Sequence, residues 1–147
     1  MGRRGLPPRR SGGVMVKLVK QLSVFLENRP GGMARICGIL AEANINILAL
    51  SVHDTVDHAI VRLIVEPHVK ALLLLEHQGL YLLEQEVVMM KLENRPGELA
   101  DLARLLARAD INIAYAYCTA TEDQGSGCLV LSTDDPRRTV DVLAGVE

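Results

Sequence analysis

The chain has 147 residues, of which 49% are hydrophobic, but it contains one Phe, three Tyr and no Trp, so its core must be aliphatic. No apolar run approaches the roughly 18 residues that a membrane helix needs, so we expect no membrane association. Four arginines lie within an Arg-, Gly- and Pro-rich stretch over residues 1–14, which we expect to be a disordered extension. Without these four, 12 basic residues remain against 18 acidic ones. That balance disfavours binding to nucleic acid.

Three cysteines are present, an odd number without CxxC spacing, so neither a disulfide framework nor a zinc site is expected. This cysteine usage is typical of a reducing, cytoplasmic location. Cys118 and Cys128 lie symmetrically about a predicted hairpin turn, so they could face each other across the strands, and we expect buried thiols in preference to a redox pair. The sequence has no nucleotide motif, metal cluster or base–nucleophile pair, so we expect no cofactor, no metal and no enzymatic activity.

An internal repeat organises the chain. Residues 27–52 and residues 93–118, offset by 66 positions, are identical at 12 of 26 positions. Both copies begin Glu-Asn-Arg-Pro-Gly, and both carry Ile-Asn-Ile in their second half. Chance would supply about one or two identities, so the repeat is a duplication of one structural unit.

The first copy predicts a strand through Leu22, Val24 and Leu26, because apolar residues alternate with polar ones. An Arg-Pro-Gly corner ends this strand, and an amphipathic helix follows, closed by Asn44. Next come two strands over residues 47–53 and 58–65 with a turn at residues 54–57, a helix that starts after Glu66-Pro67 and ends at Gly79, and a strand over residues 80–86.

The second copy repeats this order from Val87, with no linker residue between the two. A strand over residues 87–93 precedes a helix that Asp110 closes, and the hairpin turn at residues 122–127 is longer than its counterpart. A last helix begins after Asp134-Asp135-Pro136 and reaches the end of the chain, so the second copy has no fourth strand.

The order β-α-β-β-α-β predicts an α+β fold: two ferredoxin-like units in tandem, each with an antiparallel sheet and its helices on one face. We expect the units to span residues 15–86 and 87–147. The missing last strand leaves an edge at residues 87–93. Three explanations stay open: another chain covers this edge, the segment near Val14 to Leu18 covers it, or the chain is truncated.

A strand that ends in Asn-Arg-Pro-Gly, followed by a helix and by Ile-Asn-Ile, resembles the ACT domain, the amino-acid-sensing module of biosynthetic enzymes. The resemblance spans residues 20–145 and occurs twice. It implies that a ligand binds between the first corner of one unit and the second strand of a neighbouring unit. By motif, Asn28 and Asn46 match two ligand-contacting asparagines, and Asn94 and Asn112 match them in the second repeat.

The chemistry of the corner is consistent with this reading. An Asn amide offers an acceptor to an ammonium and a donor to a carboxylate, and a glycine-rich helix start favours a carboxylate. Glu98 replaces Gly32 in the second corner, so we expect the first corner to be the better site. The predicted ligand-binding residues are Asn28, Pro30, Gly31, Gly32, Met33, Asn46 and Ile47 in the first repeat, and Asn94, Gly97, Glu98, Leu99, Asn112 and Ile113 in the second.

Structural roles compete with these assignments. Asn28 and Asn94 could serve only to shape a turn, and Asn46 and Asn112 could be residues of a helix exit. The leading functional hypothesis is a non-catalytic amino-acid sensor that acts as a homodimer. The alternative is a regulatory subunit of a separate biosynthetic enzyme, such as acetohydroxyacid synthase.

Overall fold

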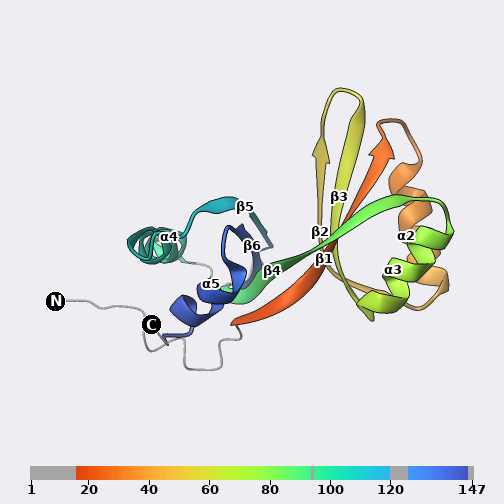
Figure 1. Cartoon of the computed structure of the whole chain (residues 1–147). Coiled ribbons are helices and arrows are strands. Elements are labelled where there is room, and N and C mark those ends of the chain that lie inside the picture. The colour runs from red at the N-terminus through yellow and green to blue at the C-terminus, as the bar shows by residue number, and fades with distance from the viewer. Residues whose placement is uncertain (1–15, 94, 120–125, 146–147) are drawn as a thin grey trace. The chain divides into compact units, whose positions relative to one another are not determined.

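A computed structural model describes residues 16–93, 95–119 and 126–145 (Figure 1). The predicted extension over residues 1–14, Asn94 and most of the second hairpin turn lie outside the described residues. Six strands form one antiparallel sheet in the order β2-β3-β1-β4-β6-β5, accompanied by helices α2 to α5. The fold is α+β with two ferredoxin-like units in tandem, as the repeat predicted.

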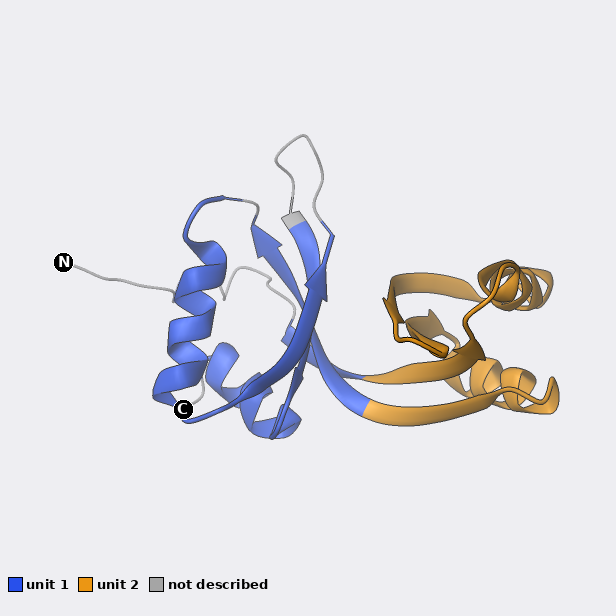
Figure 2. Cartoon of the chain, turned by 90° about the horizontal axis from the view of Figure 1, so that it is seen from above, with its two compact units in different colours: residues 1–19, 86–147 blue, residues 20–85 orange. Residues whose placement is uncertain are grey.

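Two compact units divide the chain, and Figure 2 colours them separately. Residues 20–85, which hold the first repeat, form unit 2. The described residues within 1–19 and 86–147, which include the second repeat, form unit 1.

Unit 2 is built on the hairpin of β2 and β3, against which β1 pairs. Leu22 of β1 lies opposite Leu63 of β3, and Glu27 lies opposite His58. Residues 55–57 join β2 to β3, within the turn that the sequence predicted over residues 54–57. The elements that contribute to this unit are β1 (Val16–Glu27), α2 (Gly32–Glu42), β2 (Asn46–Asp54), β3 (His58–Glu66), α3 (His68–His77) and β4 (Tyr81–Glu93).

The core of unit 2 lies between the sheet and its two helices. Leu22 and Val24 of β1 are fully buried with Ile36 and Leu40 of α2 and Leu75 of α3. The alternating strand and the amphipathic helix that the sequence predicts are therefore confirmed. Burying side chains of this size contributes about 1.5–3 kcal/mol each relative to leaving them exposed.

Unit 1 repeats the arrangement with the second half of β4, α4 (Glu98–Arg108), β5 (Ile113–Cys118), β6 (Ser126–Thr133) and α5 (Pro136–Leu143). Its core contains Val88, Leu106 and Leu131 from three of these elements. Helix α5 begins at Pro136, and the Asp135 side chain accepts a hydrogen bond from the Arg138 backbone N–H at 3.1 Å, as an N-cap does.

The edge left by the missing last strand is covered from within the chain. Among the described residues of the second repeat, no strand follows α5, and β1 is the hydrogen-bonded neighbour of β4 in the sheet. The first residues of β1 belong to unit 1, and Val16 and Leu18 pack against its core. Strand β1 therefore begins in unit 1 and continues into unit 2, and it takes the place of the absent strand.

Helices α2 and α4 end as the sequence predicted. Asn44 and Asp110 each adopt a left-handed backbone, with φ of 61° and 60°, which Asn and Asp tolerate better than most residues. Gly79, after α3, is also left-handed, with φ of 83°. In the part of the chain that the structure describes, none of the helices combines the length and apolar character that crossing a bilayer requires.

Candidate functional site: the two Pro-Gly corners

The first corner joins β1 to α2 and is bound to the turn between β2 and β3. The Asn28 backbone N–H donates to the Asp57 carbonyl at 3.3 Å. The Asn28 side-chain amide nitrogen donates to Asp54 Oδ1 at 2.6 Å and to the Thr55 carbonyl at 3.3 Å. The residues of this contact are exposed at the surface. Asn28 therefore does shape the corner, and it does so through a turn that is distant in sequence.

Glycines open the helix that follows. Gly31 has a φ of 99°, a backbone conformation that residues with a side chain rarely adopt. A Cβ added at Gly32 would lie 3.0 Å from Leu26 Cδ1, so the corner is already filled on that side. Helix α2 has no side-chain cap and no acidic residue in its first turn. Its first backbone N–H groups therefore form the kind of helix start that favours an anion.

The other predicted residues of the first repeat differ in their surroundings. Pro30 is exposed beside the glycines, and Met33 is half-buried against the core of unit 2. Asn46 is exposed at the start of β2, opposite Glu66, and Ile47 packs half-buried against the core.

Unit 2 does not bring Asn28 and Asn46 together. Asn28 follows the end of β1 that pairs with His58, and Asn46 pairs with Glu66 at the far end of β3. Eight steps along β3 at about 3.3 Å per residue separate these ends by about 26 Å. A ligand that contacts an Asn28 and an Asn46 side chain at once therefore needs unit 2 from two separate chains.

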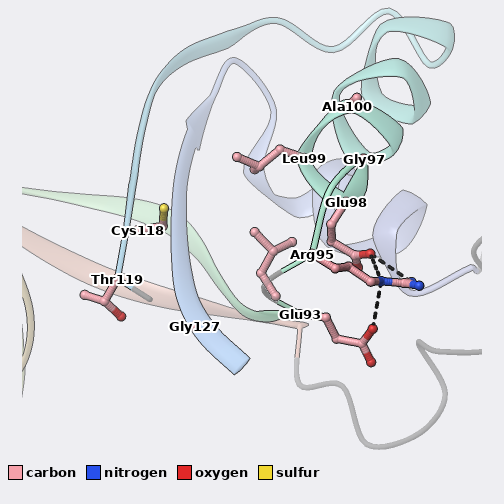
Figure 3. A pocket seen from close by; sticks show the side chains of 10 residues that line it. Glu93, Arg95, Gly97, Glu98, Leu99, Ala100, Cys118, Thr119 and Gly127 are labelled. Carbon is pink, nitrogen blue, oxygen red and sulfur yellow. Dashed lines mark hydrogen bonds and ion pairs between the residues drawn. The ribbon is translucent and has the colours of Figure 1, made fainter. Parts of the chain in front are cut away.

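The second corner carries the Glu98 side chain at the position where the first corner has Gly32. Gly97 repeats the left-handed turn of Gly31 with a φ of 90°. Arg95 binds Glu98 Oε1 through Nε and Nη2, both at 3.0 Å, and its Nε lies 3.1 Å from Glu93 Oε1. The Glu98 side chain is only 12% exposed. Figure 3 shows it next to Arg95, with their contacts dashed. A carboxylate therefore already lies at the start of α4. That the second corner is the weaker site stays a prediction.

A pocket of about 230 Å³ opens beside this second corner, between the start of α4 and the end of β5. Figure 3 shows Leu99 on the helix side and Cys118 and Thr119 on the strand side. Of the predicted residues, Gly97, Glu98 and Leu99 line it. Sequence reasoning did not include the lining residues Leu92, Glu93, Arg95, Ala100, Cys118, Thr119 and Gly127.

The pairing of the second hairpin could have identified part of this lining. A hairpin places the end of its first strand beside the start of its second, next to the corner before α4. Thr119 meets Cys128 in this way, donating through its backbone N–H to the Cys128 carbonyl at 3.0 Å. The repeat does not point to Thr119 and Cys128, because they lie beyond the end of the repeated segment.

Asn112 and Ile113 lie at the other end of unit 1. The Asn112 backbone N–H donates to Asp134 Oδ1 at 3.1 Å, and the Asp134 N–H donates back to the Asn112 carbonyl at 3.2 Å. Ile113 pairs with Thr133 and packs against the core. The corner and the strand start are thus at opposite ends in both units. Asn94 lies outside the described residues.

The prediction of buried thiols was wrong, and the two thiols do not face each other across the strands. Cys118 is exposed and lies opposite Leu129, not opposite Cys128, because the ladder is offset by one residue from the symmetry of the turn. Cys128 is half-buried opposite Lys91. Burial raises the pKa of the Cys128 thiol; the charge of Lys17 opposes this rise, and Cys118 adds to it.

The chain is thus a tandem pair of ferredoxin-like units, each with a left-handed glycine before its first helix. The family model described as "ACT domain pair" matches residues 17–146, and the chain belongs to this family. Sequence reasoning identified the family correctly. No curated protein matched the chain.

Several solved structures share this fold. Protein BT0572 from Bacteroides thetaiotaomicron is 30% identical, with a TM-score of 0.82 over 88% of this chain and 89% of that one. The ligand-free regulatory subunit of aspartate kinase from Thermus thermophilus has a TM-score of 0.70 at 15% identity, over 91% of this chain and 97% of that one. The corresponding subunit from Thermus flavus has a TM-score of 0.65 at 15% identity, over 91% and 94%. At this identity, the two aspartate kinase subunits show a shared fold.

Proposed function

We propose that the chain is a non-catalytic sensor of a free amino acid, and that the ligand binds between the first corner of one copy and the start of β2 in a second copy. The observation that carries this proposal is the separation of Asn28 and Asn46 within one unit. A site that uses both asparagines has to be assembled by association.

Strand β2 is suited to this association. It is the outermost strand on its side of the sheet formed by the described residues. Its backbone edge is therefore open to pairing. Leu50 and Val52 on β2 are 38% and 50% exposed, which adds apolar surface that a second copy would cover.

Antiparallel pairing of two β2 strands would bring the required residues together. Asp54, at the end of β2, is hydrogen-bonded to Asn28, and Asn46 is at the start of the same strand. In an antiparallel pair, the end of one strand lies beside the start of the other. Asn28 of one copy would then lie near Asn46 of the second copy. The two-fold axis of such a homodimer generates two equivalent sites, one per chain.

The groups at the corner complement a zwitterion. The uncapped N–H groups at the start of α2 can hold the carboxylate. Asn28 Oδ1 can accept from the ammonium, and Asn46 of the second copy closes the site. Ligand binding would favour the associated geometry over others, and this preference converts occupancy into a regulatory signal.

A thermal-shift screen of the common L-amino acids tests the proposal. A ligand at 100 times its Kd stabilises the folded state by about 2.7 kcal/mol, which the melting temperature of the pure protein would report. No shift with any amino acid contradicts the proposal. By calorimetry we expect one ligand per chain, with binding lost in Asn28→Ala and kept in Asn94→Ala.

The matched control is Arg29→Ala. Arg29 is the next residue along the corner, its side chain is 75% exposed, and it pairs with Glu27. Because that ion pair is on the surface, its removal should change neither stability nor affinity appreciably. Equal losses of affinity in Asn28→Ala and Arg29→Ala would indicate a general disturbance of the corner and not a lost ligand contact.

A second candidate is a regulatory subunit of a separate biosynthetic enzyme in the cytoplasm. It is favoured by the aspartate kinase regulatory subunit from Thermus thermophilus, because the aligned region takes up 97% of that chain and 91% of this one. Acetohydroxyacid synthase is another biosynthetic enzyme that this chain could regulate as a separate subunit. Co-purification with a catalytic chain, in a ratio that changes with the amino acid, would support this role over an independent sensor.

A further inference from the structure

The side-chain amide of Asn28 is held in one orientation. Its nitrogen donates to the Asp54 carboxylate at 2.6 Å and to the Thr55 carbonyl at 3.3 Å. Both partners are acceptors only. Rotating the amide by 180° would place Asn28 Oδ1 against two acceptors and remove both hydrogen bonds. The Asn28 nitrogen therefore faces the turn, and its oxygen is directed away from Asp54 and Thr55.

The turn that supplies these acceptors is itself braced. The Thr55 backbone N–H and side-chain hydroxyl both donate to the His58 carbonyl at 2.8 Å, and the His58 N–H donates back to Thr55 Oγ1 at 3.2 Å. The Asn28 N–H donates to the Asp57 carbonyl at the same turn. These bonds fix the backbone that positions the Asp54 carboxylate, which gives the shortest contact to Asn28.

We propose that Asp54 is a specificity-determining positioning residue: by fixing the Asn28 amide, it makes the first corner offer the ligand an acceptor, and so restricts the ligands to those with an α-ammonium group. This inference rests on the proposed function. The Asp54 carboxylate also adds negative charge that favours the ammonium. An α-keto acid with the same side chain has a carbonyl at that place, cannot donate to Asn28 Oδ1, and is excluded.

The experiment compares each common L-amino acid with the α-keto acid that has the same side chain, using calorimetry on the full chain. Hydrogen bonds to charged groups correspond to a preference of about tenfold to a hundredfold, and the wild type should prefer the amino acid at least this strongly. In Asp54→Asn, the new amide can donate to Asn28 Oδ1, so the Asn28 amide can turn and offer its nitrogen to a keto acid. The preference should then fall by about tenfold.

Asp57→Asn is the matched control. It removes the same charge from the same turn, but Asp57 meets Asn28 through its backbone carbonyl, which the substitution keeps. The preference for the amino acid should stay within about twofold of the wild-type value, because long-range charge effects between exposed groups are screened. A similar fall in both variants would show that net charge and not amide orientation sets the specificity, and would overturn the assignment of Asp54.

A second readout needs no ligand. The side-chain amide protons of Asn28, followed by NMR, should shift in Asp54→Asn and keep their positions in Asp57→Asn. Unchanged Asn28 signals in Asp54→Asn would overturn the inference even if the protein binds an amino acid. If the wild type binds no amino acid but the Asn28 signals shift as expected, the orientation stands and the proposed function fails, and the specificity role fails with it.

Discussion

Leu18 should stabilise unit 1, although the larger part of that unit begins at residue 86, almost seventy positions later. It lies in the part of β1 that packs against the core of unit 1, and it is half-buried there. Leu18→Ala removes about three methylene equivalents at about 0.8 kcal/mol each when fully buried, and half of this is about 1 kcal/mol. A loss of this size increases the open population of the unit about fivefold.

Hydrogen exchange followed by mass spectrometry measures this effect locally. Amides of β6 and of the second half of β4 should exchange about fivefold faster in Leu18→Ala, because opening of unit 1 controls their exposure. Amides of β2 and β3 should be affected less, since they belong to unit 2. Leu83→Ala is the control, because it is the same substitution on β4 at a side chain that is 49% exposed. If exchange in residues 86–145 is the same for Leu18→Ala and wild type, β1 does not replace the missing strand.

Two further predictions concern the corners and the cysteines. Gly32→Glu should abolish amino-acid binding in calorimetry, because it places a carboxylate at the first corner as Glu98 does at the second. Glu98→Gly frees Arg95 from one carboxylate and should raise the number of ligands bound per chain. Unchanged binding in both variants would contradict the role given to this position. Iodoacetamide near neutral pH should label Cys118 before Cys128, because the raised pKa of Cys128 lowers its thiolate fraction until the pH rises further; mass spectrometry that finds Cys128 labelled first would contradict this order.

The repeat made most of the fold predictable. Identical residues at a constant offset placed two Pro-Gly corners, two amphipathic helices and two hairpins, and local chemistry predicted the helix ends at Asn44 and Asp110. These features depend on neighbours a few residues apart. Periodicity and backbone preference describe such neighbours well.

Features that depend on contacts between distant segments were harder to predict from the sequence. Coverage by the segment near Leu18 was one of three explanations for the open edge, and the sequence of this segment alone could not show which unit it joins. The contact of Asn28 with Asp54 joins residues 26 positions apart, and nothing in the sequence around Asp54 predicts it. The offset of Cys118 and Cys128 depends on ladder register, which symmetry about a loop does not determine.

Mixing two defective variants tests the central proposal most directly. Asn28→Ala and Asn46→Ala homodimers should each fail to bind the amino acid that the wild type binds. In a mixed dimer, one site combines the intact Asn28 of one chain with the intact Asn46 of the other. After equal mixing and exchange of subunits, calorimetry should therefore recover about one site for every four chains. No recovery in a mixture that is shown to contain mixed dimers would contradict a site shared between two copies.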